Sequence, residues 1–354
     1  MTAALAVSAV ACADPPRHPH PVGLRFAAYE DEARRNWTDG GNRPLATAIW
    51  YPAPDGTREA AWRVSIFRAG WNAPGAPLAV GGTRHPLVLL SHGTGGGAAT
   101  LSWLAETLAA NGYVVAAVNH HGNTAAEPSY QLPGFVVWWD RPRDLSVLID
   151  KLLADPTFGA AIDPARIGVG GFSLGGYTAL ATVGARLDYA QWRAFCARHP
   201  GDPSCTLPPE APFSMTDVQR LLDHDERVRA AIAHSSDAFG DPRIGAAFVM
   251  APVLGGALTR DSLAAIRVPV RIVVGADDSQ AIPDQNARPL AAAIPGATLE
   301  VLPDVSHYSF LARCTLVGRL VARALCRDTV SRDDVHRRVS NEALAFFDEA
   351  LRVP

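Results

Sequence analysis

The sequence lacks an excess of basic residues and lacks long apolar runs, and each absence argues against a class of protein. Lysine occurs once, at Lys151, and the formal net charge is −3, so the chain lacks the basic footprint of a nucleic-acid-binding protein. We attribute the scarcity of lysine to compositional bias. No apolar run reaches the roughly 18 residues that a membrane-spanning helix needs. What is left is a globular chain of 354 residues, 48% hydrophobic, sufficient for one large α/β domain or two small ones.

Cysteine is also scarce, but its placement is informative. Apart from Cys12, the four cysteines form two sequence-local pairs, which predicts the bridges Cys196–Cys205 and Cys314–Cys326. Four cysteines allow three connectivities, and the sequence does not choose among them. Oxidised pairs predict a periplasmic or secreted protein. The alternative is a cytosolic enzyme with four reduced, buried cysteines.

The N-terminus supports the prediction of export. Residues 1–13 are small and apolar and end in Ala11-Cys12-Ala13, which is similar to the cleavage site of a secretory signal peptide. A short disordered tail is the alternative interpretation. Residues 14–22 are rich in proline and histidine and are predicted to be an extended linker, followed by one domain over residues 23–354. No histidine or cysteine spacing predicts a metal site, and no cofactor is expected.

Strand-like and helix-like segments alternate through the chain. We expect a mostly parallel sheet with helices on both faces, an α/β fold whose reactive groups gather at the carboxyl ends of the strands. Strands are predicted over residues 24–29, 45–51, 87–90, 113–118, 166–169, 228–233, 270–274 and 298–302. Helices are predicted over residues 98–110, 143–153 and 333–351. Residues 52–86 are interpreted as an irregular excursion that could include one more strand.

One segment interrupts this alternation. Residues 186–227 contain several aromatic residues, the pair Cys196 and Cys205, and Pro208-Pro209. The segment follows a predicted helix and precedes a predicted strand, so it is an insertion between two elements of the sheet. It is predicted to be a lid over the site; the alternative is a surface excursion that buries its own aromatic residues.

The chain is organised around the turn Gly171-Phe172-Ser173-Leu174-Gly175. An apolar, β-prone run precedes the turn at residues 166–169, and a run of small apolar residues suited to a helix follows at residues 177–183. Gly-x-Ser-x-Gly between a strand and a helix is typical of a nucleophile elbow, which exposes the serine hydroxyl above the sheet. Ser173 is therefore the candidate nucleophile.

A serine nucleophile needs a base, and the base needs an orienting acid. Asp277 and Asp278 end the strand predicted over residues 270–274, and His307 follows the next strand. The order serine, acid, histidine is that of an elbow-containing hydrolase. The oxyanion is predicted to accept hydrogen bonds from the backbone N–H groups of Leu174 and Thr94.

Other side chains at the same strand ends are expected to contact the substrate or to support the site. Trp138, Trp139, Phe172 and Tyr308 are predicted to flank the cleft and favour an apolar substrate, although the same aromatics could belong to the core. His92 is expected to brace the glycine-rich loop at residues 91–97. The remaining histidines at strand ends, His120, His121 and His234, are expected to be supporting or surface residues. Arg141 is expected to brace the loop of His120.

These motifs together resemble the α/β-hydrolase superfamily, in particular the branch of predicted dienelactone hydrolases that is related to platelet-activating-factor acetylhydrolases. The resemblance implies the α/β-hydrolase fold, and the superfamily's Gly-x-x-Asp register implies that Asp278 rather than Asp277 is the acid. A serine nucleophile argues against strict dienelactone hydrolase chemistry, where cysteine is usual. The matching segments span most of residues 85–310 and are Ser91–Gly96, Asn119–Thr124, Arg141–Asp144, Gly170–Gly176, Gly275–Asp278 and Ser306–Tyr308.

The sequence thus predicts a secreted serine hydrolase that cleaves carboxylic esters of small molecules or lipids through Ser173, His307 and Asp278. Alternatives are a lipid acetylhydrolase or lipase, a serine peptidase with the same core, and a binding protein on an inactive hydrolase scaffold. Neither nucleic acid nor a transmembrane segment is expected. The natural ester and the oligomeric state are not predicted.

Overall fold

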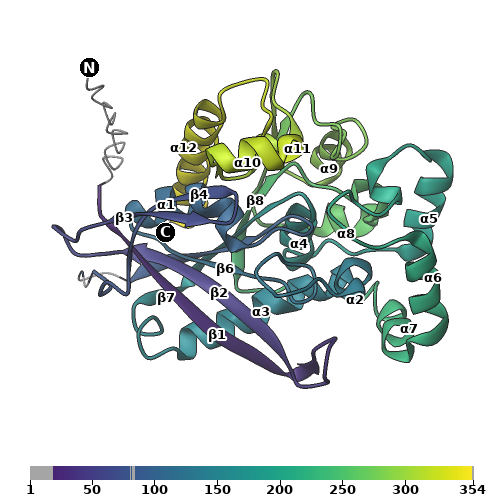
Figure 1. Ribbon diagram of the computed structural model, residues 1–354, viewed down its shortest axis with the longest axis horizontal. Helices are drawn as coiled ribbons and strands as arrows, with labels where there is room; N and C mark the ends of the chain where they lie inside the picture. Colours follow the sequence, from purple (N-terminus) through teal and green to yellow (C-terminus); the bar gives the residue numbers. More distant parts are fainter. Residues whose placement is uncertain (1–18, 80, 82–83, 353–354) are drawn as a thin grey trace, which may run out of the picture.

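The computed structural model describes residues 19–79, 81 and 84–352 (Figure 1). The predicted signal peptide at residues 1–13 lies outside the described residues, as does the linker up to residue 18. The first strand, β1 (Val22–Arg35), begins at the last residue of that predicted linker.

Six parallel strands form one side of the sheet, and the order of the strands across it differs from their order in the sequence. Their sequences are rich in valine, isoleucine, leucine and alanine, as expected for strands covered on both faces. In spatial order they are β10 (Thr298–Leu302), β9 (Val270–Gly275), β8 (Ile244–Met250), β7 (Ile162–Phe172), β5 (His85–Ser91) and β6 (Val114–Val118).

The other side of the sheet is more mixed. β2 (Asn42–Pro52) pairs antiparallel to β6 and to β1, and β4 (Phe67–Pro74) continues the sheet beyond β1. β3 (Ala60–Val64) and β11 (Arg313–Cys314) both pair antiparallel to β4. The segment between β2 and β5 therefore contains two strands, β3 and β4, where the sequence led us to expect an irregular excursion with room for one.

Helices cover both faces of the sheet. Gly168 and Gly171 lie three positions apart on β7 and so face opposite sides. Gly168 faces Phe347 of α12 (Arg332–Ala350), whereas Gly171 faces Gly175 of α4 (Leu174–Thr182). The other α-helices of the described residues, apart from those between α4 and β8, are α1 (Ser102–Ala110), α2 (Leu132–Val136), α3 (Arg141–Ala154), α8 (Arg260–Ala265), α9 (Ala287–Ala293), α10 (Leu316–Val321) and α11 (Arg323–Cys326).

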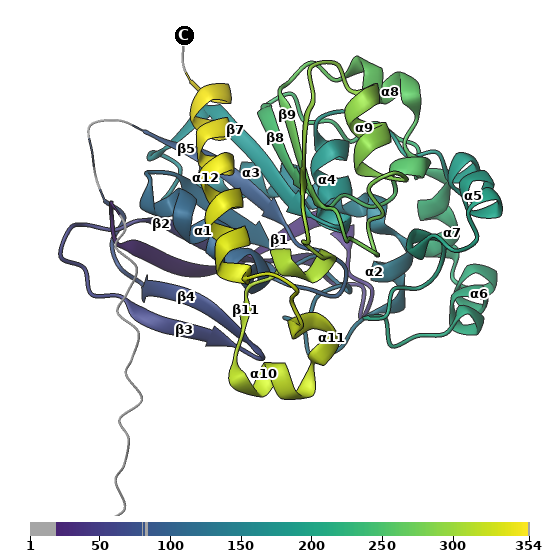
Figure 2. The ribbon, with the colours of Figure 1, turned by 90° about the horizontal axis from the view of Figure 1, so that it is seen from above.

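α12 packs with α1, and α3 packs with α4 on the other face of the sheet (Figure 2). This arrangement of a mostly parallel sheet between helices confirms the predicted fold class. Among the described residues, no helix combines the length and the apolar character that a bilayer span requires.

The insertion is longer than predicted. Residues 183–243, between α4 and β8, form α5 (Tyr189–Arg198), α6 (Met215–His224) and α7 (Glu226–Ala233), which lie together at one end of the molecule (Figures 1 and 2). From here on, "the insertion" means residues 183–243.

The prediction of a strand over residues 228–233 was wrong, because these residues belong to α7. Asp225 caps this helix: its side chain accepts hydrogen bonds from the backbone N–H groups of Arg227 and Val228. A cap followed by arginine and alanine, with apolar residues at Val228 and Ile232, is a helical signal. The strand is instead β8, which is buried except at Gly245 and which the prediction missed because its Gly-Ala-Ala start has low β-propensity.

Both predicted disulfides are present. Cys196–Cys205 joins α5 to the short turn before residue 206, and Cys314–Cys326 joins β11 to α11. Each bridge closes a short local loop outside the parallel part of the sheet. The pairing that sequence proximity favoured is thus the one in the structure.

Candidate active site

Ser173 lies at the sharp turn between β7 and α4. Its φ of 57° and ψ of −118° are strained for a residue with a side chain. The turn is tight because a Cβ atom at Gly171 would lie 2.0 Å from the Gly175 carbonyl oxygen, and one at Gly175 would lie 1.9 Å from that of Ser91. The two glycines therefore permit the close approach of strand, helix and neighbouring loop that the pattern predicts.

Three predicted residues, far apart in the sequence, form one hydrogen-bonded chain. The Ser173 hydroxyl is 3.0 Å from Nε2 of His307, and Nδ1 of His307 is 2.7 Å from Oδ2 of Asp278. With the proton on Nδ1, the ring donates to Asp278 and accepts from Ser173. We call these three residues the cavity chain.

Asp278, not Asp277, contacts the histidine. Its other oxygen, Oδ1, accepts hydrogen bonds from the backbone N–H groups of Gln280 and Ala281, so the carboxylate is fixed at both oxygens. The Asp277 side chain is exposed to solvent. The register favoured by the resemblance thus agrees with the geometry.

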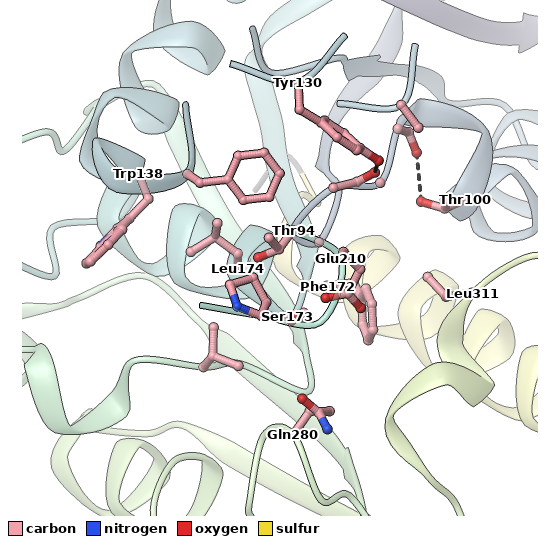
Figure 3. A pocket seen from close by; sticks show the side chains of 18 of the residues that line it. Thr94, Thr100, Tyr130, Trp138, Phe172, Ser173, Leu174, Glu210, Gln280 and Leu311 are labelled. Atoms are coloured by element: carbon pink, nitrogen blue, oxygen red, sulfur yellow. Dashed lines mark hydrogen bonds between the residues drawn. The ribbon is translucent and has the colours of Figure 1, made fainter. Parts of the chain in front are cut away.

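Two backbone N–H groups flank the serine. Among the hydrogen bonds of the described residues, the N–H groups of Leu174 and Thr94 donate to no protein acceptor. Both residues line the same cavity as Ser173, and Figure 3 shows them around it. Two unpaired donors beside a serine hydroxyl are the arrangement that an oxyanion site requires.

The cavity has a volume of about 470 Å³ and is mostly apolar. Ser173 and His307 lie at its surface, as do Phe172, Trp138 and Tyr308. The insertion supplies one part of the wall, and the β3–β4 hairpin supplies another. The apolar residues from these two segments are Tyr189, Trp192, Leu207, Met215, Val218 and Leu222 from the insertion, and Trp62, Val64, Ile66 and Phe67 from the hairpin.

Trp139 does not line the cavity, so its predicted contact with substrate was wrong. It is 1% exposed, and its indole N–H donates to the Ala231 carbonyl of α7 at 3.0 Å. Successive residues in a tight helical turn point in different directions, so Trp138 and Trp139 cannot both face the cleft. Trp138 faces the cavity, whereas Trp139 contacts α7 of the insertion through this hydrogen bond.

A second chain of the same three residue types lies behind the glycine-rich loop. The Ser91 hydroxyl is 2.8 Å from Nε2 of His120, and Nδ1 of His120 is 2.8 Å from Oδ2 of Asp144. All three residues are at most 1% exposed, and none lines the cavity. We call them the buried chain; the sequence predicted only a supporting role for His120.

Charge in the buried chain is balanced by arginine. Burial acts to raise the pKa of Asp144, but Arg43 and Arg34, which contact the carboxylate at 2.6–3.0 Å, hold it well below its usual range. Burial, and then the positive charge of Arg141, lower the pKa of His120 to about 4. His120 is therefore neutral at physiological pH.

Arg141 and His92 support the glycine-rich loop. Nη1 of Arg141 donates to the His92 carbonyl at 2.7 Å, so Arg141 braces this loop and not, as we expected, the loop of His120. Nε2 of His92 accepts the backbone N–H of His120 at 3.1 Å, in line with its predicted bracing role. Burial and the charge of Arg141 keep the pKa of His92 well below its usual range.

The other two histidines that the sequence placed at strand ends, His121 and His234, do not line the cavity. His121 is buried and lies 2.7 Å from Glu127, while His234 is exposed on the insertion. Within the part of the chain that the structure describes, no group of three histidine, cysteine or acidic residues could hold a metal ion.

Comparisons with known proteins agree with this fold and enzyme class. The family model of "Platelet-activating factor acetylhydrolase, isoform II" matches residues 67–133, which include β4, β5, α1 and β6. A solved structure, a ferulic acid esterase from Streptomyces cinnamoneus, matches with a TM-score of 0.66 and 24% sequence identity, over 96% of this chain and 92% of that one. A comparison with curated proteins found no match.

The chain therefore has the α/β-hydrolase fold, as its motifs predicted. The matching family model describes acetylhydrolases, and the similar solved structure is an esterase. Both agree with the predicted class of carboxylic ester hydrolase. The family match covers the glycine-rich loop but ends before Ser173, so it does not bear on the cavity chain.

Proposed function

We propose that this protein is a serine hydrolase of carboxylic esters, with Ser173 as nucleophile. The observation that carries the proposal is the cavity chain beside two unpaired N–H donors, at the surface of a mostly apolar cavity of about 470 Å³. No other nucleophile on the described residues combines a base at hydrogen-bond distance with such a cavity.

In the proposed reaction, the Ser173 hydroxyl attacks the ester carbonyl carbon while Nε2 of His307 takes its proton. The carbonyl oxygen becomes an oxyanion that accepts hydrogen bonds from the N–H groups of Thr94 and Leu174. Asp278 holds the Nδ1–H tautomer of His307 and stabilises the imidazolium. When the tetrahedral intermediate collapses, Nε2 returns the proton to the departing alcohol oxygen and leaves an acyl ester on Ser173.

Water completes the cycle by the same route. His307 takes a proton from the water that attacks the acyl carbon, and it then protonates Oγ as Ser173 leaves. The net reaction converts one ester and one water into an acid and an alcohol, so no oxidant, metal or cofactor is consumed. None is proposed.

The wall of the cavity supports an ester with an apolar part. Phe172 packs against His307 with ring centroids 4.7 Å apart, and Trp138 and Tyr308 extend the aromatic wall. The family match favours a lipid acetyl ester as a second candidate, and the structural neighbour favours a feruloyl ester. No feature of the cavity favours the peptidase alternative.

The two disulfides support export to the periplasm or the exterior, because such bonds persist in oxidising compartments. The signal peptide proposed for residues 1–13 would direct that export. Sequencing the N-terminus of the protein recovered from the periplasm or medium tests the proposal; a chain that starts at Met1 and stays in the cytoplasm would refute it.

The activity is tested with p-nitrophenyl acetate through octanoate, methyl ferulate and a peptide p-nitroanilide. We expect hydrolysis of at least one ester series and none of the anilide. A fluorophosphonate should label the wild type on Ser173 and leave the Ser173→Ala variant unlabelled. A folded wild type that neither hydrolyses any ester nor takes the label would refute the proposal and leave the binding-scaffold alternative.

A further inference from the structure

One carboxylate lines the cavity. Apart from His307, Glu210 is the only aspartate, glutamate, histidine, lysine or arginine among the described residues at the cavity surface. It comes from the insertion, five residues after Cys205. Figure 3 shows its side chain in the same region as Phe172, Ser173 and Thr94. The proposed reaction assigns it no role.

Glu210 is held in place from two sides. The Tyr308 hydroxyl donates to Oε1 of Glu210 at 2.6 Å, and Tyr308 directly follows His307 in the sequence. On the other side, a Cβ atom at Gly95 would lie 3.0 Å from Cβ of Glu210, so Glu210 packs on the glycine-rich loop. Tyr130 fixes that loop by donating to the Gly95 carbonyl at 2.8 Å. The carboxylate is therefore placed by both loops that carry the reaction.

One oxygen of this carboxylate remains available. Burial, and then the negative charge of Glu210, raise the pKa of Tyr308, so the tyrosine keeps its proton and remains the donor. Within the described residues, no donor forms a hydrogen bond with the second oxygen, Oε2, and no arginine or lysine pairs with the group. By contrast, both carboxylate oxygens of Asp144 and of Asp278 accept hydrogen bonds from protein donors.

We infer that Glu210 determines the charge specificity of this cavity: it disfavours esters with a negative group near the scissile bond and favours neutral or cationic ones. The inference rests on the proposed ester hydrolysis. A fixed, uncompensated charge at the wall of a mostly apolar cavity acts over several ångströms, because the apolar surroundings screen it less than bulk water does. Excluding like charge is also an inexpensive way to gain specificity, since it needs no contact with the preferred substrate.

Two matched series of esters test this inference. In the first, p-nitrophenyl esters carry a neutral pentanoyl, an anionic hemiglutaryl or a cationic 4-(trimethylammonio)butyryl group. In the second, butyrate esters carry an uncharged, an anionic or a trimethylammonium alcohol of similar size. Because one series places the charge on the acid and the other on the alcohol, either orientation of the substrate brings a charge toward Glu210.

The measured quantity is the ratio of kcat/KM for charged and neutral esters, compared between variants so that intrinsic ester reactivity cancels. For the wild type we expect the anionic ester to be disfavoured about 10- to 100-fold in at least one series. Glu210→Gln removes the charge at similar volume. We expect the fold difference in kcat/KM between the neutral and the anionic ester that is due to Glu210 to fall close to one in this variant. Glu349→Gln, which removes an exposed carboxylate at the end of α12, is the matched control and should leave the ratio unchanged.

A second variant separates charge from mechanical support. Tyr308→Phe removes the hydrogen bond but keeps the carboxylate, so the penalty should keep its sign even if all rates fall. If Glu210 acts only as a latch for the insertion, both variants will change the rates of all esters by similar factors and leave the ratio unmoved. That result would overturn the inference.

Ionic strength provides a test that needs no variant. In the wild type, the penalty on the anionic ester should shrink as NaCl rises from about 20 mM to about 1 M, because salt screens a partly exposed charge. Neutral-ester turnover with no charge discrimination in either series would refute the role of Glu210 and leave the proposed function standing. A protein that hydrolyses no ester and resists the fluorophosphonate would instead refute the function itself.

Discussion

The molecule contains the same Ser-His-Asp hydrogen-bond chain twice, in two different surroundings. In the cavity chain the two distances are 3.0 and 2.7 Å, and in the buried chain both are 2.8 Å. Distances between the three residues therefore do not distinguish the two. What differs is the backbone of the serine, the partners of the carboxylate and the space in front of the hydroxyl.

The surroundings suit the two chains to different tasks. Ser173 has a strained backbone and faces a cavity with two unpaired N–H groups, whereas Ser91 is the fully buried last residue of β5. Asp278 accepts hydrogen bonds from two backbone N–H groups, while Asp144 is engaged by two arginines. The comparison teaches that hydrogen-bond distances alone do not identify an active site, and that space for a substrate and donors for an oxyanion must be compared as well.

The largest contrast is expected between the two serines. Ser173→Ala should reduce ester turnover by two to six orders of magnitude, the range expected for a triad nucleophile. Ser91→Ala removes one buried hydrogen bond, and we expect its kcat/KM to stay within about tenfold of the wild type. Assays of both purified variants, with circular dichroism as a check on folding, measure the difference. Fluorophosphonate labelling of Ser91, or a fully active Ser173→Ala variant, would reverse the assignment.

Substitution of Asp278 in the cavity chain should lower activity, whereas substitution of Asp144 in the buried chain should lower stability. Asp278→Asn should lower kcat by about 10⁴-fold with little loss of stability, because the amide no longer favours the Nδ1–H tautomer of His307 that leaves Nε2 free to accept the serine proton. Asp277→Asn should have a small effect, since that side chain is exposed.

Asp144→Asn leaves Arg34 and Arg43 without their shared partner and should cost about 3–5 kcal/mol of unfolding free energy. Urea denaturation together with kcat for each variant measures both quantities. If Asp144→Asn lowered kcat as much as Asp278→Asn at unchanged stability, the two chains would not be functionally distinct.

The buried histidine should make stability depend on pH. The folded-state pKa of His120, about 4, lies below its unfolded value of about 6.5, so the unfolded chain binds the proton more readily between these values. Its contribution is fully present above pH 6.5 and is lost as the pH falls toward 4, by about 3 kcal/mol in total. Melting temperatures from pH 7 to pH 4 should decline less steeply in His120→Gln than in the wild type. The exposed residue His234 supplies the control, and His234→Gln should decline like the wild type.

The smallest effects are expected from the two disulfides. Ellman titration of the denatured, unreduced protein should detect none of the thiols of Cys196, Cys205, Cys314 and Cys326, and all four after reduction. Each short loop should contribute about 2–3 kcal/mol in the chain-entropy model, so reduction should lower the melting temperature.

Cys205 lines the cavity, so the Cys196→Ala, Cys205→Ala double variant should raise KM. The Cys314→Ala, Cys326→Ala double variant tests whether the other bridge restrains the segment after His307, in which case kcat should fall. Four free thiols in protein from an oxidising compartment would contradict both bridges and weaken the argument for export.

Much of this protein was determined by its local sequence. The glycines around Ser173 allow the strand and the following helix to approach closely, as a nucleophile elbow requires. One apolar run ends just before Asp278 and another just before His307, so a strand is expected to end at each place. These are properties of neighbouring residues, so the elbow, the parallel strands and the chain order serine, acid, histidine could be predicted. The same locality explains the two disulfides, whose partners are nine and twelve residues apart.

Other features were decided by contacts between distant segments, which a single sequence does not encode locally. The cap at Asp225 is a local signal for the helix over residues 228–233 that the strand prediction overlooked, whereas the contact of Trp139 with the Ala231 carbonyl of that helix joins distant segments. Trp139 and Trp138 are adjacent, yet only the fold determines which one faces the cavity. Glu210 accepts a hydrogen bond from Tyr308, 98 residues away in the sequence, because the insertion and the segment after His307 line the same cavity. Burial and long-range charge pairing arise only when the chain is compact, and therefore the tertiary structure alone separated the cavity chain from the buried one.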